Sequence, residues 1–455
     1  MSAVDTSIFK AYDIRGEYPQ QLNEKLAYKI GRAFATLLIT ENPDQKLTVV
    51  ISRDMRPSSP ALKQEVVRGL TEAGLDVVDI GLATTPTFYF AVSRYGYDGG
   101  LQITASHNPA QYNGLKMVRS EAKPIGGGTG MEELRDYVVE ENFAKLDRIG
   151  QAEQKQGVLK DLITEQTKDI NLEEIDPLKI VVDAANSVGS LDMEALFEQL
   201  KAELIPMYFE LDGTFPNHEA DPLKEENLED IKEKIIETKA DLGIAIDGDG
   251  DRIFFVDNRG RTMPQAMLRG IMAQIELKEQ PEAKVCYDIR PGRITLDLIK
   301  QAGGKPIVTR VGHSLIKAKM LEEDAIFGGE SSGHYFYQFD YGSFEAPVRL
   351  VAKFLHYLSQ QEQTLAEIVD ELKTYHHSGE INSQVDDKDA VLKQLVEKYS
   401  DAKISYLDGV TITYDDYWFN VRPSNTEPKL RLNLEAKTKE LMEEKQDEVL
   451  AIIRG

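Results

Sequence analysis

Three aspartates separated by single glycines form the run DGDGDR at residues 247–252. Carboxylates this close repel one another unless a cation lies among them, and glycine lets the backbone wrap their oxygens around an ion. An EF-hand is excluded, because Arg252 and Asn258 stand where that motif needs glycine and glutamate. The alternative to a metal site is a solvated acidic turn. The metal interpretation predicts three ligands for a hard cation such as Mg²⁺, with Arg252 beside them to take a phosphate: Asp247, Asp249 and Asp251.

A serine follows a strand-like run in TASHNP, residues 104–109. Histidine, asparagine and proline after a serine are typical of a turn that exposes the hydroxyl group. Thr104 and Asn108 replace the glycines of the Gly-x-Ser-x-Gly motif of acyl-transferring hydrolases. Ser106 is therefore better suited to carrying a phosphoryl group opposite the aspartates, with an ordinary serine-containing loop as the alternative. His107 either assists Ser106 or is only a residue of the turn.

Two further polar loops suit the binding of a sugar phosphate. GGESSGH at 328–334 alternates carboxylate, hydroxyl and imidazole, so these three side chains share a face if the segment is extended, and they suit sugar hydroxyls. RPSNTEP at 422–428 combines a guanidinium with hydroxyls and backbone N–H groups, which is typical of a phosphate nest. The alternatives are a surface turn and a hairpin loop.

Composition and missing motifs exclude several classes of protein. The net charge of −24 disfavours nonspecific binding to nucleic acid and to anionic membranes, although a cleft can still be locally basic. One cysteine, Cys286, excludes an intrachain disulfide. No P-loop, HExxH or paired-cysteine zinc motif occurs, and GGGTG at 126–130 is interpreted as a flexible turn. We find no secretory signal and no apolar run of the ~18 residues that span a bilayer, so a cytoplasmic protein is expected.

The elements that must position these loops recur along the 455 residues. Strand-like runs alternate with helical periodicity, in three sets of three strands, and the third run of each set leads into a polar loop. The predicted strands are 47–51, 75–80 and 100–104, then 179–183, 204–209 and 241–246, then 284–288, 305–309 and 325–327. Because ligands of open α/β sheets gather beyond the carboxyl ends of strands, we expect the three loops to meet in one cleft.

The last part of the chain has a different pattern. A polar stretch at 376–389 is typical of a linker or of the entry to a domain, and a helix at 390–399, several strands and a helix at 438–453 follow it. We therefore predict an α/β protein with three related α/β domains, built on mixed sheets around a central cleft, and a smaller C-terminal α+β domain that could move as a lid. The expected domain boundaries are 1–152, 153–257, 258–372 and 373–455.

Six segments in order along the chain resemble the α-D-phosphohexomutase superfamily, particularly its bacterial phosphomannomutase/phosphoglucomutase group. They are FKAYDIRG (9–16), TASHNP, DGDGDR, RVGHS (310–314), GGESSGH and RPSNTEP. The resemblance implies a phosphoserine at Ser106, whose phosphate oxygen completes an Mg²⁺ site with the three aspartates. It implies that the reacting end is lined by Tyr12, Arg15, Lys116 and Arg252. It also implies that Gly312 and His313 contact the substrate.

The same resemblance implies the groups that hold the rest of the substrate. Glu330 and Ser332 match ligands of sugar hydroxyls, with His334 close by. The phosphate that does not react is bound by four residues: Arg422, Ser424, Asn425 and Thr426. Arg290 stands where some members carry lysine, so an acid or base role at this position is in doubt while a phosphate or hydroxyl contact is expected.

The expected activity is interconversion of hexose 1-phosphate and hexose 6-phosphate through a hexose 1,6-bisphosphate, which also serves as activator. Ser331 and Asn425 stand where the hexosamine branch often has glutamine and glycine, so mannose and glucose phosphates are favoured and phosphoglucosamine mutase is the alternative. A non-catalytic sugar-phosphate-binding homologue and a phosphatase that uses Asp247 as nucleophile are alternatives of other classes. The expected partners are small sugar phosphates, with no nucleic acid or membrane, and the protein is a monomer or dimer.

Overall fold

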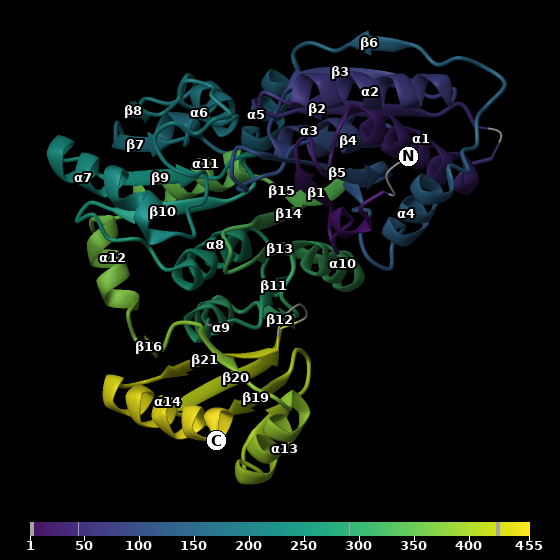
Figure 1. Ribbon diagram of the computed structural model, residues 1–455. Coiled ribbons are helices and arrows are strands. Elements are labelled where there is room, and N and C mark those ends of the chain that lie inside the picture. Colours follow the sequence, from purple (N-terminus) through teal and green to yellow (C-terminus); the bar gives the residue numbers. More distant parts are fainter. Residues whose placement is uncertain (1–3, 44, 291, 425–427) are drawn as a thin grey trace. The chain divides into compact units, whose positions relative to one another are not determined.

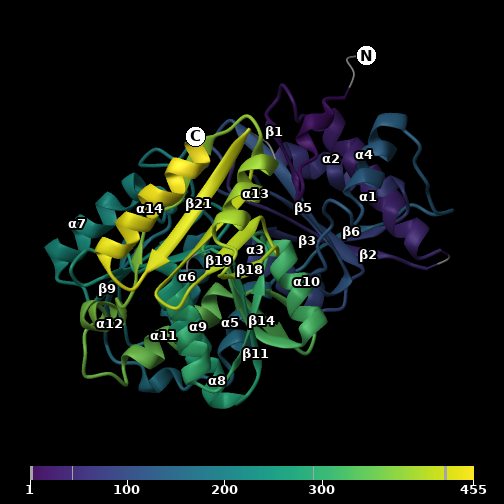
Figure 2. The same ribbon diagram turned by 90° about the horizontal axis from the view of Figure 1, so that it is seen from below.

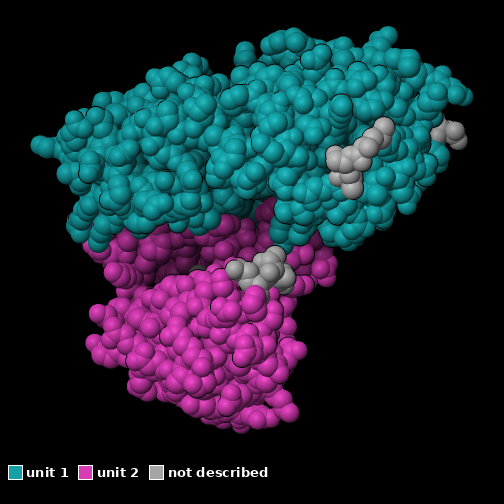
Figure 3. All heavy atoms as spheres, in the orientation of Figure 1, with its two compact units in different colours: residues 1–262, 333–365 teal, residues 263–332, 366–455 magenta. Residues whose placement is uncertain are grey.

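The computed structural model describes residues 4–43, 45–290, 292–424 and 428–455 (Figure 1). These form two compact units, which Figure 3 colours separately: unit 1 comprises residues 1–262 and 333–365, and unit 2 comprises residues 263–332 and 366–455. Four short 3-10 helices are η1 (Thr6–Ile8), η2 (Ser120–Ala122), η3 (Leu172–Glu174) and η4 (Glu225–Leu228). Within the described residues, no helix has both the length and the apolarity to cross a membrane.

Unit 1 begins with a mixed sheet whose strand order is β1-β5-β4-β2-β3-β6. Its strands are β1 (Ile14–Glu17), β2 (Thr48–Arg53), β3 (Asp76–Leu82), β4 (Gly99–Ile103), β5 (Tyr112–Arg119) and β6 (Ala152–Gln154). The accompanying helices are α1 (Glu24–Glu41), α2 (Ser59–Glu72), α3 (Thr85–Arg94) and α4 (Met131–Glu140). The β-branched centre of β2 is fully buried, and α1 begins where Asn23 Oδ1 accepts from the backbone N–H of Leu26 at 3.1 Å.

A second sheet of unit 1 has the order β10-β9-β7-β8. Its strands are β7 (Lys179–Asp183), β8 (Glu203–Met207), β9 (Leu242–Ile246) and β10 (Ile253–Asp257), and its helices are α5 (Val158–Thr167), α6 (Gly189–Phe197) and α7 (Glu229–Thr238). Unit 1 also contains the antiparallel hairpin β14 (Tyr335–Phe339) and β15 (Gly342–Glu345), followed by α11 (Pro347–Leu358).

Unit 2 begins with a parallel group of strands. These are β11 (Lys284–Asp288), β12 (Lys305–Thr309) and β13 (Ala325–Gly329), with helices α8 (Gln265–Glu279), α9 (Arg293–Gln301) and α10 (His313–Glu323). β11 pairs in parallel with both β12 and β13. The first strand of the set thus lies between the second and the third.

The same arrangement occurs in all three predicted sets. β2 pairs in parallel with β3 and β4, and β7 pairs in parallel with β8 and β9. The polar loops that carry the candidate chemistry follow β4, β9 and β13, which are the equivalent third strands. The prediction of three related α/β domains is therefore confirmed, and the recurrence places each loop at the carboxyl end of an equivalent strand.

The C-terminal part of unit 2 is an antiparallel sheet covered by helices, as predicted. Its strands are β16 (His376–His377), β17 (Ile381–Gln384), β18 (Lys403–Ser405), β19 (Val410–Thr413), β20 (Tyr417–Pro423) and β21 (Lys429–Ala436), and its helices are α13 (Lys388–Lys398) and α14 (Lys439–Arg454). Figures 1 and 2 both show α13 and α14 on one face of this sheet, and a further helix, α12 (Leu365–Leu372), precedes it. Of the two alternatives for residues 376–389, the entry to a domain agrees with the structure, because β16 and β17 within them pair with β21. Ile381 and Ser383 turn inward on β17 and their neighbours point outward, a pattern too short to stand out from sequence.

Candidate functional site

Ser106 lies in a tight turn just after β4. Its backbone is left-handed, with φ of 50°, and its N–H donates to Thr104 Oγ1 at 3.0 Å. This conformation is uncommon for a residue other than glycine and persists only where the surroundings impose it. The turn directs Ser106 Oγ to Asp247 Oδ2, 3.0 Å away. The predicted phosphoryl carrier and the predicted metal ligands are therefore in direct contact.

Arg56 fixes the shape of the Ser106 turn. Its guanidinium is fully buried, pairs with Asp54 at 3.1 Å, and donates to the carbonyl oxygens of Ser106, Asn108, Pro109 and Tyr112 at 2.6–2.9 Å. Charge-assisted hydrogen bonds of this kind satisfy carbonyl groups that a tight turn leaves without partners. Sequence reasoning missed Arg56, since its acceptors lie about 50 residues further along the chain and it belongs to no local motif.

The aspartate loop follows β9 and packs directly on the serine turn. Asp247, Asp249 and Asp251 are all buried. A Cβ atom at Gly248 would lie 2.3 Å from the Ser106 carbonyl oxygen, so the close approach of the two loops requires glycine at that position. Gly248 of DGDGDR therefore permits the contact between the aspartate loop and the serine turn.

The charge of the aspartate cluster is only partly balanced by Lys116. Lys116 Nζ lies 2.7 Å from Asp249 Oδ2 and also pairs with Asp251 Oδ2. Burial raises the pKa of Asp247 well above its usual range, and the charges of Asp251 and Asp249 raise it further. Burial alone would lower the pKa of Lys116, but Asp249 and Asp251 hold it well above its usual range.

The donor set fits a hard dication. One carboxylate oxygen from each of the three aspartates lies within 4.8 Å of the others. Asp249 Oδ1 is buried, and the described part of the chain offers it no hydrogen-bond donor. A buried carboxylate oxygen without a partner is costly, and three carboxylates around one point suit Mg²⁺.

Two guanidinium groups border the cluster, as the sequence predicts. Arg15 Nε pairs with Asp13 at 2.7 Å and its Nη1 donates to Asn108 in the serine turn. Arg252 Nε lies 3.8 Å from Asp247 Oδ2. Burial opposes the charge of Arg15, yet Asp13 and Asp249 raise its pKa. Guanidinium groups in these positions can stabilise phosphate oxygens.

The other predicted residues of the reacting end differ in their surroundings. His107 Nδ1 lies 3.1 Å from Ser106 Oγ, and burial together with the charges of Arg252 and Arg15 lowers its pKa to about 2. Its imidazole is therefore neutral and cannot serve as a charged acid. Tyr12 is 37% exposed, just before β1.

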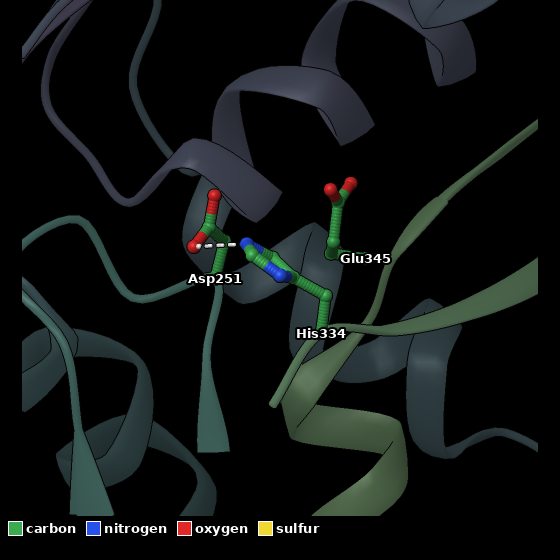
Figure 4. A group of neighbouring side chains, drawn as sticks. All are labelled: Asp251, His334 and Glu345. Atoms are coloured by element: carbon green, nitrogen blue, oxygen red, sulfur yellow. Dashed lines mark ion pairs between the residues drawn. The ribbon is translucent and has the colours of Figure 1, made fainter. Parts of the chain in front are cut away.

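His334 lies against the aspartate loop within unit 1. The backbone N–H of Ile253 donates to the carbonyl oxygen of Gly333 at 3.0 Å, which brings the two segments together. His334 Nε2 is 3.2 Å from Asp251 Oδ1 (Figure 4). Burial opposes ionisation of Asp251, but Lys116 and His334 hold its pKa well below the usual range. Glu345, at the end of β15, is the third member of this group and was not predicted from sequence.

The predicted sugar-binding residues gather around Glu330 in unit 2. Its carboxylate accepts from Arg290 Nη2 at 3.1 Å, from the backbone N–H of Gly312 at 3.0 Å and from Ser332 Oγ at 2.6 Å. His313 begins α10 directly after Gly312. Burial opposes the charge of Arg290, but Asp288 and Glu330 raise its pKa. Four of the predicted residues therefore form one hydrogen-bonded group.

The loop 328–334 is not one extended segment. Gly333 has φ of 94°, a left-handed conformation that turns the chain before β14. The alternation of Glu330, Ser332 and His334 therefore does not continue as a single face, because the turn interrupts the period of two. Asp288, which sequence reasoning missed, anchors the loop by accepting from the backbone and hydroxyl groups of Ser331 at 3.2 and 2.7 Å.

The predicted phosphate nest lies on the C-terminal sheet. Arg422 is at the end of β20, and its Nη2 pairs with Glu380 Oε2 at 2.7 Å. Ser424 donates its N–H to the carbonyl oxygen of Lys429 at 2.9 Å. The other two predicted residues, Asn425 and Thr426, lie outside the described residues.

Comparisons with known proteins agree with this organisation. Four family models match in order: phosphoglucomutase/phosphomannomutase alpha/beta/alpha domains I (residues 6–145), II (160–260) and III (266–375), and the C-terminal domain (380–452). A phosphomannomutase of Escherichia coli is 38% identical over 440 residues, which cover 94% of each chain. A Xanthomonas campestris protein named as a phosphohexose mutase is 39% identical over 98% of this chain and 99% of its own.

A solved structure has the same architecture. A phosphoglucomutase/phosphomannomutase family protein from Burkholderia thailandensis superimposes with a TM-score of 0.89 and 33% sequence identity, over 98% of this chain and 96% of that one. Both the sequence and the fold match over nearly the full length. The chain therefore belongs to the phosphoglucomutase/phosphomannomutase family.

Proposed function

We propose that this phosphohexomutase interconverts the 1- and 6-phosphates of mannose, glucose or both through a phosphoserine at Ser106 and a hexose 1,6-bisphosphate. The observation that carries the proposal is the 3.0 Å contact between Ser106 Oγ and Asp247 Oδ2. A hydroxyl beside three buried carboxylates is a poor place for a dianionic phosphate unless a metal ion is also bound there. The need for a metal ion beside the serine favours phosphoryl transfer over acyl transfer.

The metal in this proposal is Mg²⁺, held by Asp247, Asp249, Asp251 and an oxygen of phosphorylated Ser106. When bound, Mg²⁺ supplies positive charge that neutralises the transferring phosphoryl group. Lys116 already holds two of the aspartates by ion pairs, so the carboxylates are positioned before the ion arrives. The Arg56 hydrogen bonds fix the serine turn against them.

In the forward half-reaction, a sugar hydroxyl oxygen attacks the phosphorus on Ser106. A new P–O bond forms to the sugar and the P–O bond to Ser106 Oγ breaks; the sugar hydroxyl loses its proton to a base, and Ser106 Oγ takes up a proton to become a hydroxyl again. Arg15 and Arg252 lie where they can stabilise the equatorial phosphate oxygens. The bisphosphate then reorients and returns its other phosphoryl group to Ser106, and added bisphosphate loads unphosphorylated protein in the same way.

Residues of unit 2 bind the sugar hydroxyls and the phosphate that does not react in this proposal. Glu330 accepts three hydrogen bonds within the group described above, and we propose that sugar hydroxyls bind to it and to Ser332, with Arg290, Gly312 and His313 alongside. Arg422, Ser424, Asn425 and Thr426 take the phosphate that does not react. Binding this phosphate supplies energy and orientation for the step at Ser106. The expected ligands are small sugar phosphates, and the expected compartment is the cytoplasm.

The test is a parallel assay of mannose, glucose and glucosamine 1-phosphates with Mg²⁺ and a trace of hexose 1,6-bisphosphate. We expect turnover of the mannose or glucose compound, and loss of turnover in Ser106→Ala. Preference for the glucosamine compound would favour the hexosamine mutase instead. Release of inorganic phosphate by Ser106→Ala at the wild-type rate would favour the phosphatase, and sugar-phosphate binding without any turnover would favour the non-catalytic homologue.

A further inference from the structure

A second group of metal-binding side chains lies beside the aspartate cluster in unit 1. It consists of Asp251, His334 and Glu345, which come from the loop after β9, the segment before β14 and the end of β15 (Figure 4). Their exposed fractions are 3%, 5% and 0%. Three buried donors from separate segments are held in place by the fold and lose little freedom when they bind a ligand.

The two oxygens of Asp251 face different partners. Oδ2 pairs with Lys116 Nζ and so belongs to the aspartate cluster. Oδ1 is buried and lies 3.2 Å from His334 Nε2. This oxygen therefore faces the second group.

The spacing of the three donors suits a small ion. Donor atoms at 2.0–2.1 Å around a tetrahedral dication lie about 3.3 Å from one another. The Asp251–His334 pair is already near that spacing, and one ligand atom from each of the three residues lies within 4.8 Å of the other two. A side-chain movement of at most about 1.5 Å would complete three ligands and leave a fourth position open.

We propose that Asp251, His334 and Glu345 bind a transition-metal dication such as Zn²⁺ or Co²⁺, in addition to the Mg²⁺ site. One imidazole and two carboxylates are a donor set that Zn²⁺ and Co²⁺ accept readily, whereas Mg²⁺ prefers oxygen ligands alone. Two carboxylates also balance the charge of the ion. Bound metal would fix the His334 ring and engage Asp251 Oδ1, so we expect it to inhibit the mutase even when Mg²⁺ is saturating.

The test uses Co²⁺ as the probe, with the full-length protein in saturating Mg²⁺. Equilibrium dialysis should show one retained Co²⁺ per chain, and its visible spectrum should have the intense bands of a four- or five-coordinate ion. Glu345→Gln keeps the side-chain volume and should weaken Co²⁺ binding by about tenfold or more while Mg²⁺ binding is retained. The matched control is Asp192→Asn, another buried carboxylate of unit 1, which should bind Co²⁺ like wild type.

Two results would overturn the proposal. One is the absence of Co²⁺ retention by Mg²⁺-saturated wild-type protein, and the other is unchanged Co²⁺ affinity in Glu345→Gln. If Glu345→Gln does not fold, X-ray absorption of Zn²⁺-loaded wild type decides the matter without any variant. Scattering from one imidazole ligand is expected there, and a shell of oxygen ligands alone would contradict the site. None of these measurements depends on mutase activity, so they are separate from the test of the proposed function.

Discussion

The Ser106 cluster of unit 1 and the Glu330 and Arg422 groups of unit 2 arrange charge in different ways. In unit 1, Lys116 pairs with only two of the three buried aspartates, and Asp249 Oδ1 has no hydrogen-bond donor among the described residues. In unit 2, Arg290 is paired with carboxylates on both sides, and Arg422 is paired with Glu380. The first region therefore needs a cation, whereas the second must exchange an ion pair to accept an anion. Substitutions in the Ser106 cluster should therefore abolish catalysis, whereas substitutions in the unit 2 groups should weaken substrate binding.

The largest effect is expected from Ser106→Ala. Removing the hydroxyl removes the proposed phosphoryl carrier, so kcat/KM should fall by about 10³-fold or more, while the neighbouring carboxylates stay in place. Steady-state assays with a hexose 1-phosphate measure this. Ser120→Ala, an exposed serine of the same domain, should behave like wild type, and an equal loss in both variants would remove the distinction between the two regions.

Asp249→Asn tests the need for a cation directly. The amide is a weaker ligand than the carboxylate and removes one negative charge, so the Mg²⁺ concentration for half-maximal activity should rise by about 10- to 100-fold. Titration of activity with Mg²⁺ measures the change. Asp161→Asn, at an exposed position, serves as the control. An unchanged Mg²⁺ requirement would mean that Asp249 is not a ligand.

Arg56→Met tests whether Arg56 stabilises the folded serine turn. The substitution leaves the Asp54 carboxylate buried without its partner and removes four hydrogen bonds to carbonyl oxygens, so the free energy of unfolding should fall by about 3 kcal/mol. Denaturant titration measures the loss. Arg68→Met, on the exposed side of α2, should change stability by no more than about 0.5 kcal/mol. Equal stability of the two variants would contradict the structural role of Arg56.

Arg422→Gln should act on binding in unit 2. Loss of one charge-assisted phosphate contact predicts a rise in KM of about tenfold with a smaller change in kcat. Lys403→Gln, on the exposed strand β18, is the control. A loss of kcat as large as that of Ser106→Ala would show that the binding group of unit 2 is also part of the chemistry.

The smallest effect is expected in the pH dependence of the free energy of unfolding, through the buried carboxyl group of Asp192. Asp192 is buried and accepts hydrogen bonds from Thr84 and Thr87, and burial raises its pKa to about 7 from the ordinary 3.8. The folded protein therefore keeps a proton that the unfolded chain releases, and this contribution to stability is lost as pH rises from about 4 to about 7. Unfolding titrations at pH 5 and pH 7 should show wild type losing roughly 1–2 kcal/mol relative to Asp192→Asn. Parallel stability changes in the two proteins would contradict this.

Sequence patterns predicted the features that are local. The strand runs, the helices and the loops after β4, β9 and β13 each carry their own periodicity or motif, so the three related domains could be predicted. The equivalence of the third strands then indicated that Ser106 and Asp247 belong to neighbouring loops. Their direct contact depends on the close approach of the two loops at Gly248, which the structure shows and the sequence does not.

The features that sequence analysis missed depend on distant partners. Arg56 binds carbonyl groups about 50 residues away, and Glu345 approaches Asp251 only because the β14–β15 hairpin folds against the domain II loop in unit 1. Neither residue stands in a recognisable motif. The alternation proposed for residues 328–334 failed because the left-handed turn at Gly333 breaks it, and a glycine alone does not reveal its φ angle. Short edge strands such as β17 bury too few apolar residues to be detected.

The most direct test of the account is to follow one phosphoryl group through Ser106. Protein treated with hexose 1,6-bisphosphate and freed of sugar should carry a single phosphoryl group, which mass spectrometry maps to Ser106. Addition of hexose 1-phosphate in one turnover with Mg²⁺ should move that group onto the sugar as the bisphosphate. A phosphoryl group mapped to Asp247, or one that stays on the protein while substrate turns over, would contradict the account.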